Sequence, residues 1–409
     1  MDPRKILLII FDGLGDRPIP ELGHKTPLEA APKSALDWFA SNGVNGLLDP
    51  IAPGVRPGSD TSHLALFGYD PFEVYTGRGP FEAAGVGIDI EPGDIAFRCN
   101  FVTVDEGMKV LDRRAGRIRE GTEELAKALD GMKLGRVKAI FRAGTEHRAA
   151  LVLRGKGLSP QVSDTDPHEH GVVVPESKPL APKAKTTAKA LNAFTKQAYR
   201  LLKDHPVNTA RVARGEMPGN LVLARGPGVV PELKSLGELY GLKAAGIAGV
   251  TLIKGMCRAV GMDVLEVPGA TGGLDTNMVA KGEAALNALR TYDLVFVNVK
   301  AADVCGHDGK ASEKIKVIER IDQMMAQLKA KLPSDVIVAI TADHSTPCAV
   351  QDHSGDPVPL TIFGDGVRVD GVPSYDERSV AKGGLGRIRG RDLLPILLSL
   401  ANRAEKYGS

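Results

Sequence analysis

The chain has 409 residues, of which 43% are hydrophobic and 25% charged, and its formal net charge is +2. This length favours two domains over one, and the composition is that of a soluble globular protein. The near-neutral charge disfavours nucleic acid as the main partner, and no stretch approaches the roughly 18 apolar residues of a membrane span, so we expect neither nucleic acid nor membrane as a partner.

The first predicted strand covers residues 6–10 and ends in the glycine-rich turn 11–16, which carries Asp12. An Asp delivered by a buried strand into such a turn is either a metal ligand or the cap of the next helix. The segment 57–63 then leads into a short helix. Ser59 lies where this helix begins, and helix N-termini attract anions, so Ser59 is well placed to receive a phosphate group. The N-terminus shows no cleavable signal peptide and the four cysteines form no CxxC pair, which predicts a cytoplasmic protein with free thiols.

The middle of the chain changes character after residue 75. We expect strands at 96–102, 137–142 and 149–154, a helix at 122–130, an exposed connection at 175–189, a helix at 188–203 and a short strand at 221–225. Strands with few helices among them predict a small α+β domain. The segment 113–119 contains four arginines, which form either a solvated face or a site for phosphate and carboxylate groups.

From residue 243 onward, short apolar runs alternate with helical patterns. Strands are predicted at 246–250, 264–267, 293–299, 335–341 and 360–363, and helices at 252–260, 275–290, 311–332 and 393–400. Such βα alternation predicts a doubly wound, mainly parallel sheet with helices on both faces, which makes the chain an α/β protein.

Acidic and histidine side chains follow two of these strands. Asp303 and His307 come after 293–299, Asp343 and His344 come after 335–341, and His353 follows soon after. Each pair could be an ordinary surface or loop feature. Because parallel strands gather their carboxyl ends at one edge, these residues together with Asp12 and Ser59 instead predict two divalent-metal sites. Two such ions suit phosphoryl transfer, with Ser59 as the nucleophile.

At this point the sequence resembles the alkaline phosphatase superfamily and, more closely, the archaeal-type cofactor-independent phosphoglycerate mutases. The resemblance covers nearly the whole chain. It rests on the segments 11–13, 57–63, 67–71, 77–83, 112–117, 164–168, 303–307, 341–344 and 353–359. It implies an isomerase that interconverts 2-phosphoglycerate and 3-phosphoglycerate in glycolysis and gluconeogenesis through a phosphoserine intermediate.

The resemblance also implies roles for individual residues. Ser59 would be the nucleophile, Asp303, His307 and His353 would hold one metal, and Asp12, Ser59, Asp343 and His344 would hold the other, with Mn, Mg, Co or Zn as the ion. An inserted cap at 86–185 would bind the glycerate and divide the phosphatase-like core into 1–85 and 186–409. Its candidate substrate residues are Arg113 and Arg117, then Arg78, Arg98, Asp166 and His168, with Lys243 of the core as a phosphate contact. A homo-oligomer is compatible with this resemblance.

Three rival functions remain open at this stage. A metal-dependent phosphatase or phosphodiesterase would share every metal ligand and differ in its cap. A small-molecule kinase of the same superfamily would need a nucleotide site, and the sequence contains no P-loop. A metal-binding structural protein would have no reason to carry the nucleophile together with the whole ligand set.

Overall fold

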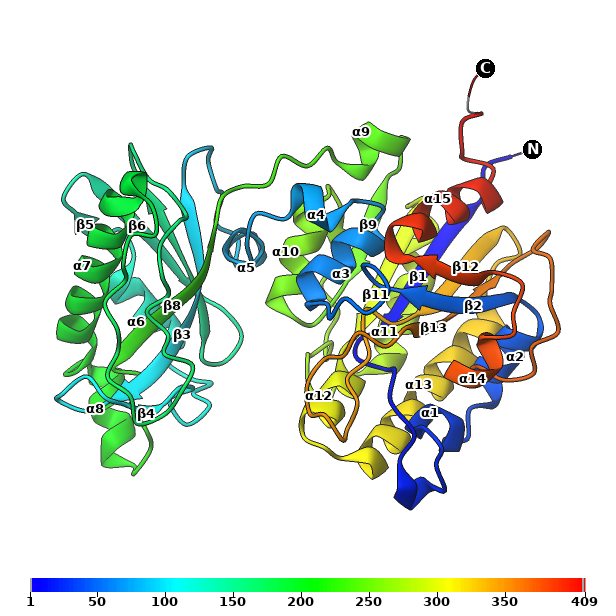
Figure 1. Cartoon of the computed structure of the whole chain (residues 1–409), viewed down its shortest axis with the longest axis horizontal. Coiled ribbons are helices and arrows are strands. Elements are labelled where there is room, and N and C mark those ends of the chain that lie inside the picture. The colour runs from blue at the N-terminus through cyan, green and yellow to red at the C-terminus, as the bar shows by residue number, and fades with distance from the viewer. Residues whose placement is uncertain (1, 407, 409) are drawn as a thin grey trace. The chain divides into compact units, whose positions relative to one another are not determined.

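The computed structural model describes residues 2–406 and 408, which form two compact units (Figure 1). The core unit is built from the chain up to Val74 and from Leu233 onward. The inserted unit comprises Tyr75–Glu232. No described helix is long and apolar enough to cross a membrane.

The core unit contains an eight-stranded sheet in the order β10-β9-β11-β1-β12-β13-β2-β14. Its strands are β1 (Lys5–Phe11), β2 (Val44–Asp49), β9 (Ala244–Ile247), β10 (Asp263–Val264), β11 (Leu294–Val299), β12 (Val336–Thr341), β13 (Val358–Phe363) and β14 (Gly386–Arg389). β1 pairs in parallel with β11 on one side and β12 on the other. Among the described strands of this sheet, β13 alone runs against its neighbours.

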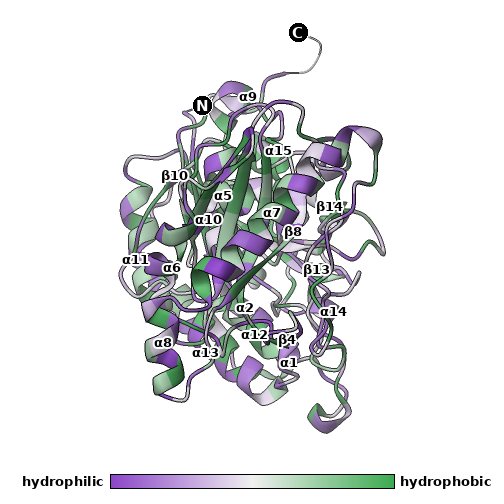
Figure 2. Ribbon diagram, turned by 90° about the vertical axis from the view of Figure 1, so that its left-hand side faces the viewer, coloured by the Kyte–Doolittle hydropathy of each residue, from purple (hydrophilic) through white to green (hydrophobic). Residues whose placement is uncertain are grey.

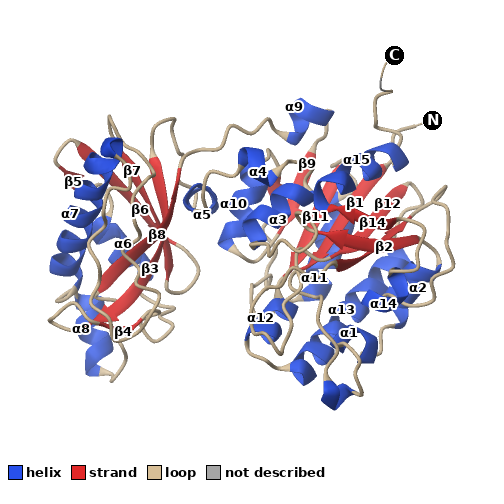
Figure 3. Ribbon diagram, viewed as in Figure 1, coloured by secondary structure: helices blue, strands red, loops and turns tan. Residues whose placement is uncertain are grey.

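Helices cover both faces of this sheet (Figure 3). They are α1 (Pro27–Ala30), α2 (Ser34–Ser41), α3 (Ser59–Leu66), α4 (Pro71–Val74), α9 (Leu236–Tyr240), α10 (Thr251–Ala259), α11 (Met278–Ala288), α12 (Ala301–His307), α13 (Ala311–Lys331), α14 (Glu377–Val380) and α15 (Gly390–Leu400), with a 3-10 turn at Pro20–Leu22. One group packs α3 against α10 and α15, and another packs α13 against α1, α2, α11 and α12. The central strands are therefore buried on both faces, which explains why they are continuous apolar runs and appear green in Figure 2.

The inserted unit is an α+β domain with an antiparallel sheet in the order β4-β3-β7-β6-β5, to which β8 adds beside β3. Its strands are β3 (Ile95–Val104), β4 (Val110–Asp112), β5 (Lys133–Leu134), β6 (Val137–Ala143), β7 (Arg148–Arg154) and β8 (Leu221–Gly228). Its helices are α5 (Gly79–Gly85), α6 (Thr122–Leu129), α7 (Lys185–Leu202) and α8 (Pro206–Ala213), with a 3-10 turn at Pro182–Ala184.

The α/β class and the inserted α+β unit are confirmed, but the boundaries of the insert are corrected. The predicted insert of 86–185 is too short, because residues 75–85 and 186–232 also belong to this unit. The apolar face of α7 packs on the inserted sheet, where the Phe194 ring lies 5.7 Å from the Phe141 ring. β8 completes that sheet by pairing with β3. The segment between 185 and 232 therefore cannot be part of the core.

Candidate active site

The carboxyl ends of three adjacent parallel strands deliver the predicted acidic side chains to one edge of the core sheet. Asp12 directly follows β1, Asp343 follows the neighbouring β12, and Asp303 lies in α12, which begins two residues after β11. All three are at most 2% exposed. Such an edge is where ligands bind in open α/β sheets.

The first cluster is formed by Asp12, Asp343 and His344, whose ligand atoms lie within 4.8 Å of one another. Ser59, the first residue of α3, lies beside them, with its Oγ 3.1 Å from His344 Nε2. The backbone N–H of Gly13 donates to Asp343 Oδ1 at 3.1 Å, which fixes that carboxylate against the loop that follows β1. This cluster contains all four residues expected to hold one metal.

The second cluster brings together Asp303, His307 and His353. Asp303 Oδ1 lies 3.4 Å from His307 Nε2 and 3.6 Å from His353 Nε2. The ring of His353 stacks on that of His344 with 3.6 Å between centroids, so the two clusters are continuous. The structure also adds Asp352, which lies with His307 and His353 in a third group of potential ligand atoms.

The three histidines are oriented by bonds to their other ring nitrogen. His307 Nδ1 lies 3.0 Å from the carbonyl of Gln351, and His353 Nδ1 lies 2.8 Å from the carbonyl of Pro57. His344 Nδ1 lies 3.0 Å from the Thr346 hydroxyl, which itself donates to Asp303. With Nδ1 donating to these oxygens, each Nε2 is left to face the carboxylates. This arrangement is typical of metal-binding histidines.

The charge balance of the site fits divalent cations. The Lys300 ammonium lies between Asp12 Oδ1 (3.0 Å) and Asp303 Oδ2 (2.7 Å) and is the lysine that bridges these carboxylates in the structure. Burial and the charge of Asp343 raise the pKa of Asp12. Asp343 Oδ2 is buried and makes no hydrogen bond among the described residues. Three buried carboxylates with one ammonium and an oxygen without a hydrogen bond form a donor set that Mn, Zn or Mg would satisfy.

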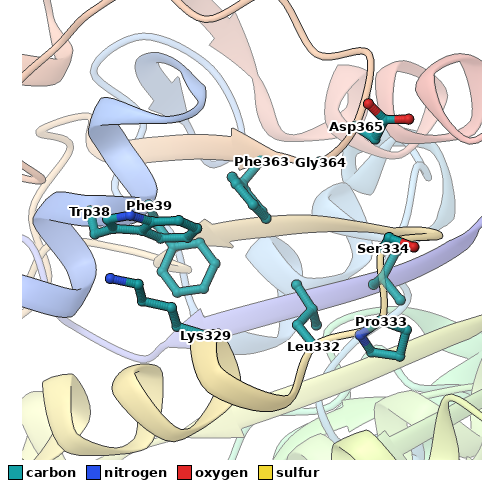
Figure 4. Close-up of a pocket in the computed structure, with 10 residues that line it drawn as sticks. Trp38, Phe39, Lys329, Leu332, Pro333, Ser334, Phe363, Gly364 and Asp365 are labelled. Carbon is teal, nitrogen blue, oxygen red and sulfur yellow. The ribbon is translucent and has the colours of Figure 1, made fainter.

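A hollow of about 370 Å³ in the core unit is not part of this site (Figure 4). It is lined mainly by apolar side chains, including Trp38, Phe39 and Phe363. Val336 and Phe363, which border it, lie at the amino end of β12 and the carboxyl end of the antiparallel β13. It therefore lies at the opposite edge of the sheet from Asp343 and His344.

The inserted unit contains a guanidinium cluster. Glu82 Oε1 lies 3.1 Å from Arg78 Nε and 3.4 Å from Arg98 Nε. Asp166 accepts two hydrogen bonds from Arg113, at 3.1 and 2.7 Å, and lies 3.6 Å from Arg225 Nη1.

Burial and the charge of neighbouring arginines lower the pKa of Arg98, and burial likewise lowers the pKa values of Arg148 and Arg225. A cluster in which guanidiniums outnumber the carboxylates that contact them is suited to an anionic ligand.

Other predicted substrate residues lie differently. Arg117 is exposed, with a positive φ of 58°. His168 is half exposed and lies 3.7 Å from Asp164. The structure does not bring Lys243 to the acid–histidine clusters. Lys243 precedes β9 at the amino edge of the sheet, where its ammonium lies 5.0 Å from the centre of the Tyr292 ring, so the predicted phosphate contact is corrected.

Sequence reasoning missed several residues of both clusters: Lys300, Asn298, His63, Glu82, Arg148 and Arg225. Lys300 carries a signal that could have been used, because it is the first charged residue after the apolar run of β11. Arg225 likewise interrupts the apolar run of β8.

Comparison with known proteins identifies the family. The 2,3-bisphosphoglycerate-independent phosphoglycerate mutase 1 of Methanothermobacter thermautotrophicus is 51% identical over 411 residues, covering 99% of this chain and 100% of that protein. The mutase of Methanosphaera stadtmanae is 50% identical over 410 residues, with 99% and 100% coverage. This chain belongs to the 2,3-bisphosphoglycerate-independent phosphoglycerate mutases.

Solved structures agree with membership of this mutase family. A Pyrococcus horikoshii protein is similar over the full length of both chains, with 41% identity and a TM-score of 0.87. The cofactor-independent phosphoglycerate mutase from Thermoplasma acidophilum matches 97% of this chain and 100% of its own, with 42% identity and a TM-score of 0.71. Residues 40–208 also match the family described as 2,3-bisphosphoglycerate-independent phosphoglycerate mutase. The predicted resemblance to these mutases is confirmed, and the chain is an enzyme.

Proposed function

We propose that this enzyme interconverts 2-phosphoglycerate and 3-phosphoglycerate, a step of glycolysis and gluconeogenesis, by passing the phosphoryl group through Ser59. The observation that carries the proposal is the position of Ser59. Its hydroxyl begins helix α3 and lies 3.1 Å from His344 Nε2, beside the carboxylates of Asp12 and Asp343. A hydroxyl at a helix N-terminus also has backbone N–H groups nearby that favour a bound phosphate.

Two divalent ions complete this proposal. Asp12, Asp343 and His344, with Ser59, would hold one ion, and Asp303, His307 and His353 would hold the other. Bound there, such ions would neutralise charge on the phosphoryl oxygens and lower the pKa of the serine hydroxyl.

The chain's own residues then account for a balanced reaction. Ser59 Oγ forms a bond to phosphorus while the bond between phosphorus and the substrate oxygen breaks, and that oxygen takes up a proton. In the second transfer the other hydroxyl of the glyceric acid attacks phosphoserine, loses its proton and restores Ser59. The acid must stay bound between the two transfers. The guanidinium cluster of the inserted unit supplies the charge that would retain its carboxylate.

The decisive assay couples product formation from 3-phosphoglycerate to enolase and measures released inorganic phosphate in parallel. The proposal predicts isomerisation in excess of hydrolysis, with no requirement for a nucleotide. Phosphate release without isomerisation would instead indicate a phosphatase, and strict dependence on ATP would indicate a kinase. Ser59→Ala should abolish both transfers. Ser62→Ala is the matched control, because its hydroxyl donates to the backbone carbonyls of Gly58 and Ser59 within the same helix.

A further inference from the structure

One face of the inserted sheet carries a polar strip between two apolar clusters. Alternate residues of a strand share a face, so Ala96, Arg98, Asn100 and Val102 of β3 point to the same side. Ala96 belongs to an apolar cluster that includes residues of α5 and β7. Val102 belongs to a second cluster with residues of β4 and β8. Arg98 and Asn100 interrupt what would otherwise be a continuous apolar surface.

The neighbouring strands extend this strip with further arginines. Arg98 pairs with Arg225 of β8, and Asn100 pairs with Arg148 of β7. Residues directly opposite each other on paired strands share a face, so Asn100 lies among three guanidiniums. It is the one neutral hydrogen-bonding side chain at the centre of this strip.

Asn100 is buried but its amide is incompletely bonded. The residue is 7% exposed, and its Oδ1 is buried without a hydrogen-bond partner among the described residues. Arg98 Nε, on the same face, is buried and also makes no hydrogen bond. Buried polar atoms are nearly always paired, so these two atoms on one face indicate that a polar ligand binds there.

The donors and acceptors of the ligand identify its partner. A phosphoglycerate has a carboxylate and a phosphate that accept hydrogen bonds, and its free hydroxyl is the group that donates. Guanidiniums can only donate, so they cannot accept from that hydroxyl. The carboxylates of Glu82 and Asp166 already accept from arginines. The amide oxygen of Asn100 is thus the acceptor left for the hydroxyl.

We infer that Asn100 binds the free hydroxyl of the glyceric acid and makes the enzyme selective for acids that carry it. This inference rests on the proposed mutase function. After the first transfer the acid has two hydroxyls, and one must be held while the other attacks phosphoserine. A side chain that accepts from one hydroxyl orients the acid for that step. A site built to bond a hydroxyl also rejects analogues that lack it.

The test compares 3-phosphoglycerate with 3-phosphooxypropanoate, which keeps the carboxylate and phosphate but has no hydroxyl. KM is measured for the first and the inhibition constant for the second. In the metal-loaded wild-type enzyme the analogue should bind at least about tenfold more weakly, the size expected for one hydrogen bond. Asn100→Leu should reduce this ratio to near one by weakening 3-phosphoglycerate, while affinity for the analogue changes less than about threefold.

The matched control is Asn220→Ala in the same unit. The Asn220 amide bonds only to the backbone N–H and carbonyl of Val104 in the structure, so its loss should change stability and leave the ratio intact.

Equal affinity of wild type for both compounds would overturn the inference without any variant. An unchanged ratio in Asn100→Leu would overturn it as well. Wild-type turnover of 3-phosphoglycerate separates the two proposals. Lost selectivity with turnover intact refutes the role of Asn100 alone, whereas absence of turnover refutes the mutase function.

Discussion

The buried ion pair between Lys314 and Asp16 gives the sharpest prediction about stability. Both side chains are fully buried, and Lys314 Nζ lies 2.8 Å from Asp16 Oδ2. Lys314 also donates to the carbonyls of Gly15 at 3.2 Å and Thr346 at 3.1 Å. It thereby joins the loop after Asp12 to the loop after His344. Lys314→Met would leave the Asp16 carboxylate buried without this counter-charge, which should cost about 3–5 kcal/mol of unfolding free energy.

Urea denaturation followed by tryptophan fluorescence measures this loss in the correct unit. Trp38 is the single tryptophan of the chain and lies in α2, which packs against the helix α13 that carries Lys314. Lys316→Met is the matched control, because Lys316 forms an exposed pair with Glu313 on the same helix and should leave the midpoint unchanged. Adding Asp16→Asn to Lys314→Met should recover part of the loss. A loss below about 1 kcal/mol in Lys314→Met would refute the reasoning.

Three further predictions concern the ions, the arginines and pH. Chelation should abolish activity and Mn, Co or Mg should restore it; activity in excess chelator with no metal found by elemental analysis would contradict the metal sites. Arg113→Ala should cost about 2–5 kcal/mol in kcat/KM and raise the ratio of hydrolysis to isomerisation, with a smaller effect for the exposed Arg117→Ala; equal, unchanged kinetics in both would exclude this anchor. Burial raises the pKa of Glu377 to about 7, so its favourable contribution is present at low pH and is lost as pH rises toward 7. Glu377→Gln should therefore gain stability relative to wild type between pH 5 and pH 8 in urea denaturation, and a difference independent of pH would contradict this.

The sequence was informative where a short-range pattern determines position. The apolar runs of β1, β11 and β12 predict buried parallel strands, and parallel strands gather their ends. The meeting of Asp12, Asp303 and Asp343 follows from that rule alone. His353 was harder, because it lies on a loop, and the structure brings it to the site by stacking it on His344.

Long-range packing was not readable in the same way. The amphipathic pattern of α7 predicts a helix but does not say which sheet it covers, so residues 186–232 were placed in the wrong unit. Arg148 and Arg225 were missed because their relation to Arg98 depends on strand register, which brings together residues far apart in the chain. Lys243 was misplaced because it precedes its strand and so lies at the opposite edge from the ligands that follow theirs.

The central claim is that Ser59 carries the phosphoryl group, and isolation of the phosphorylated enzyme tests it most directly. The metal-loaded enzyme would be mixed with phosphoglycerate, stopped by acid during turnover, digested and analysed by mass spectrometry. The account predicts one phosphoryl group on the peptide that contains Ser59, present in Ser62→Ala and absent in Ser59→Ala, which should also be inactive. Undiminished turnover in Ser59→Ala, or a phosphoryl group on another residue in the active enzyme, would contradict it.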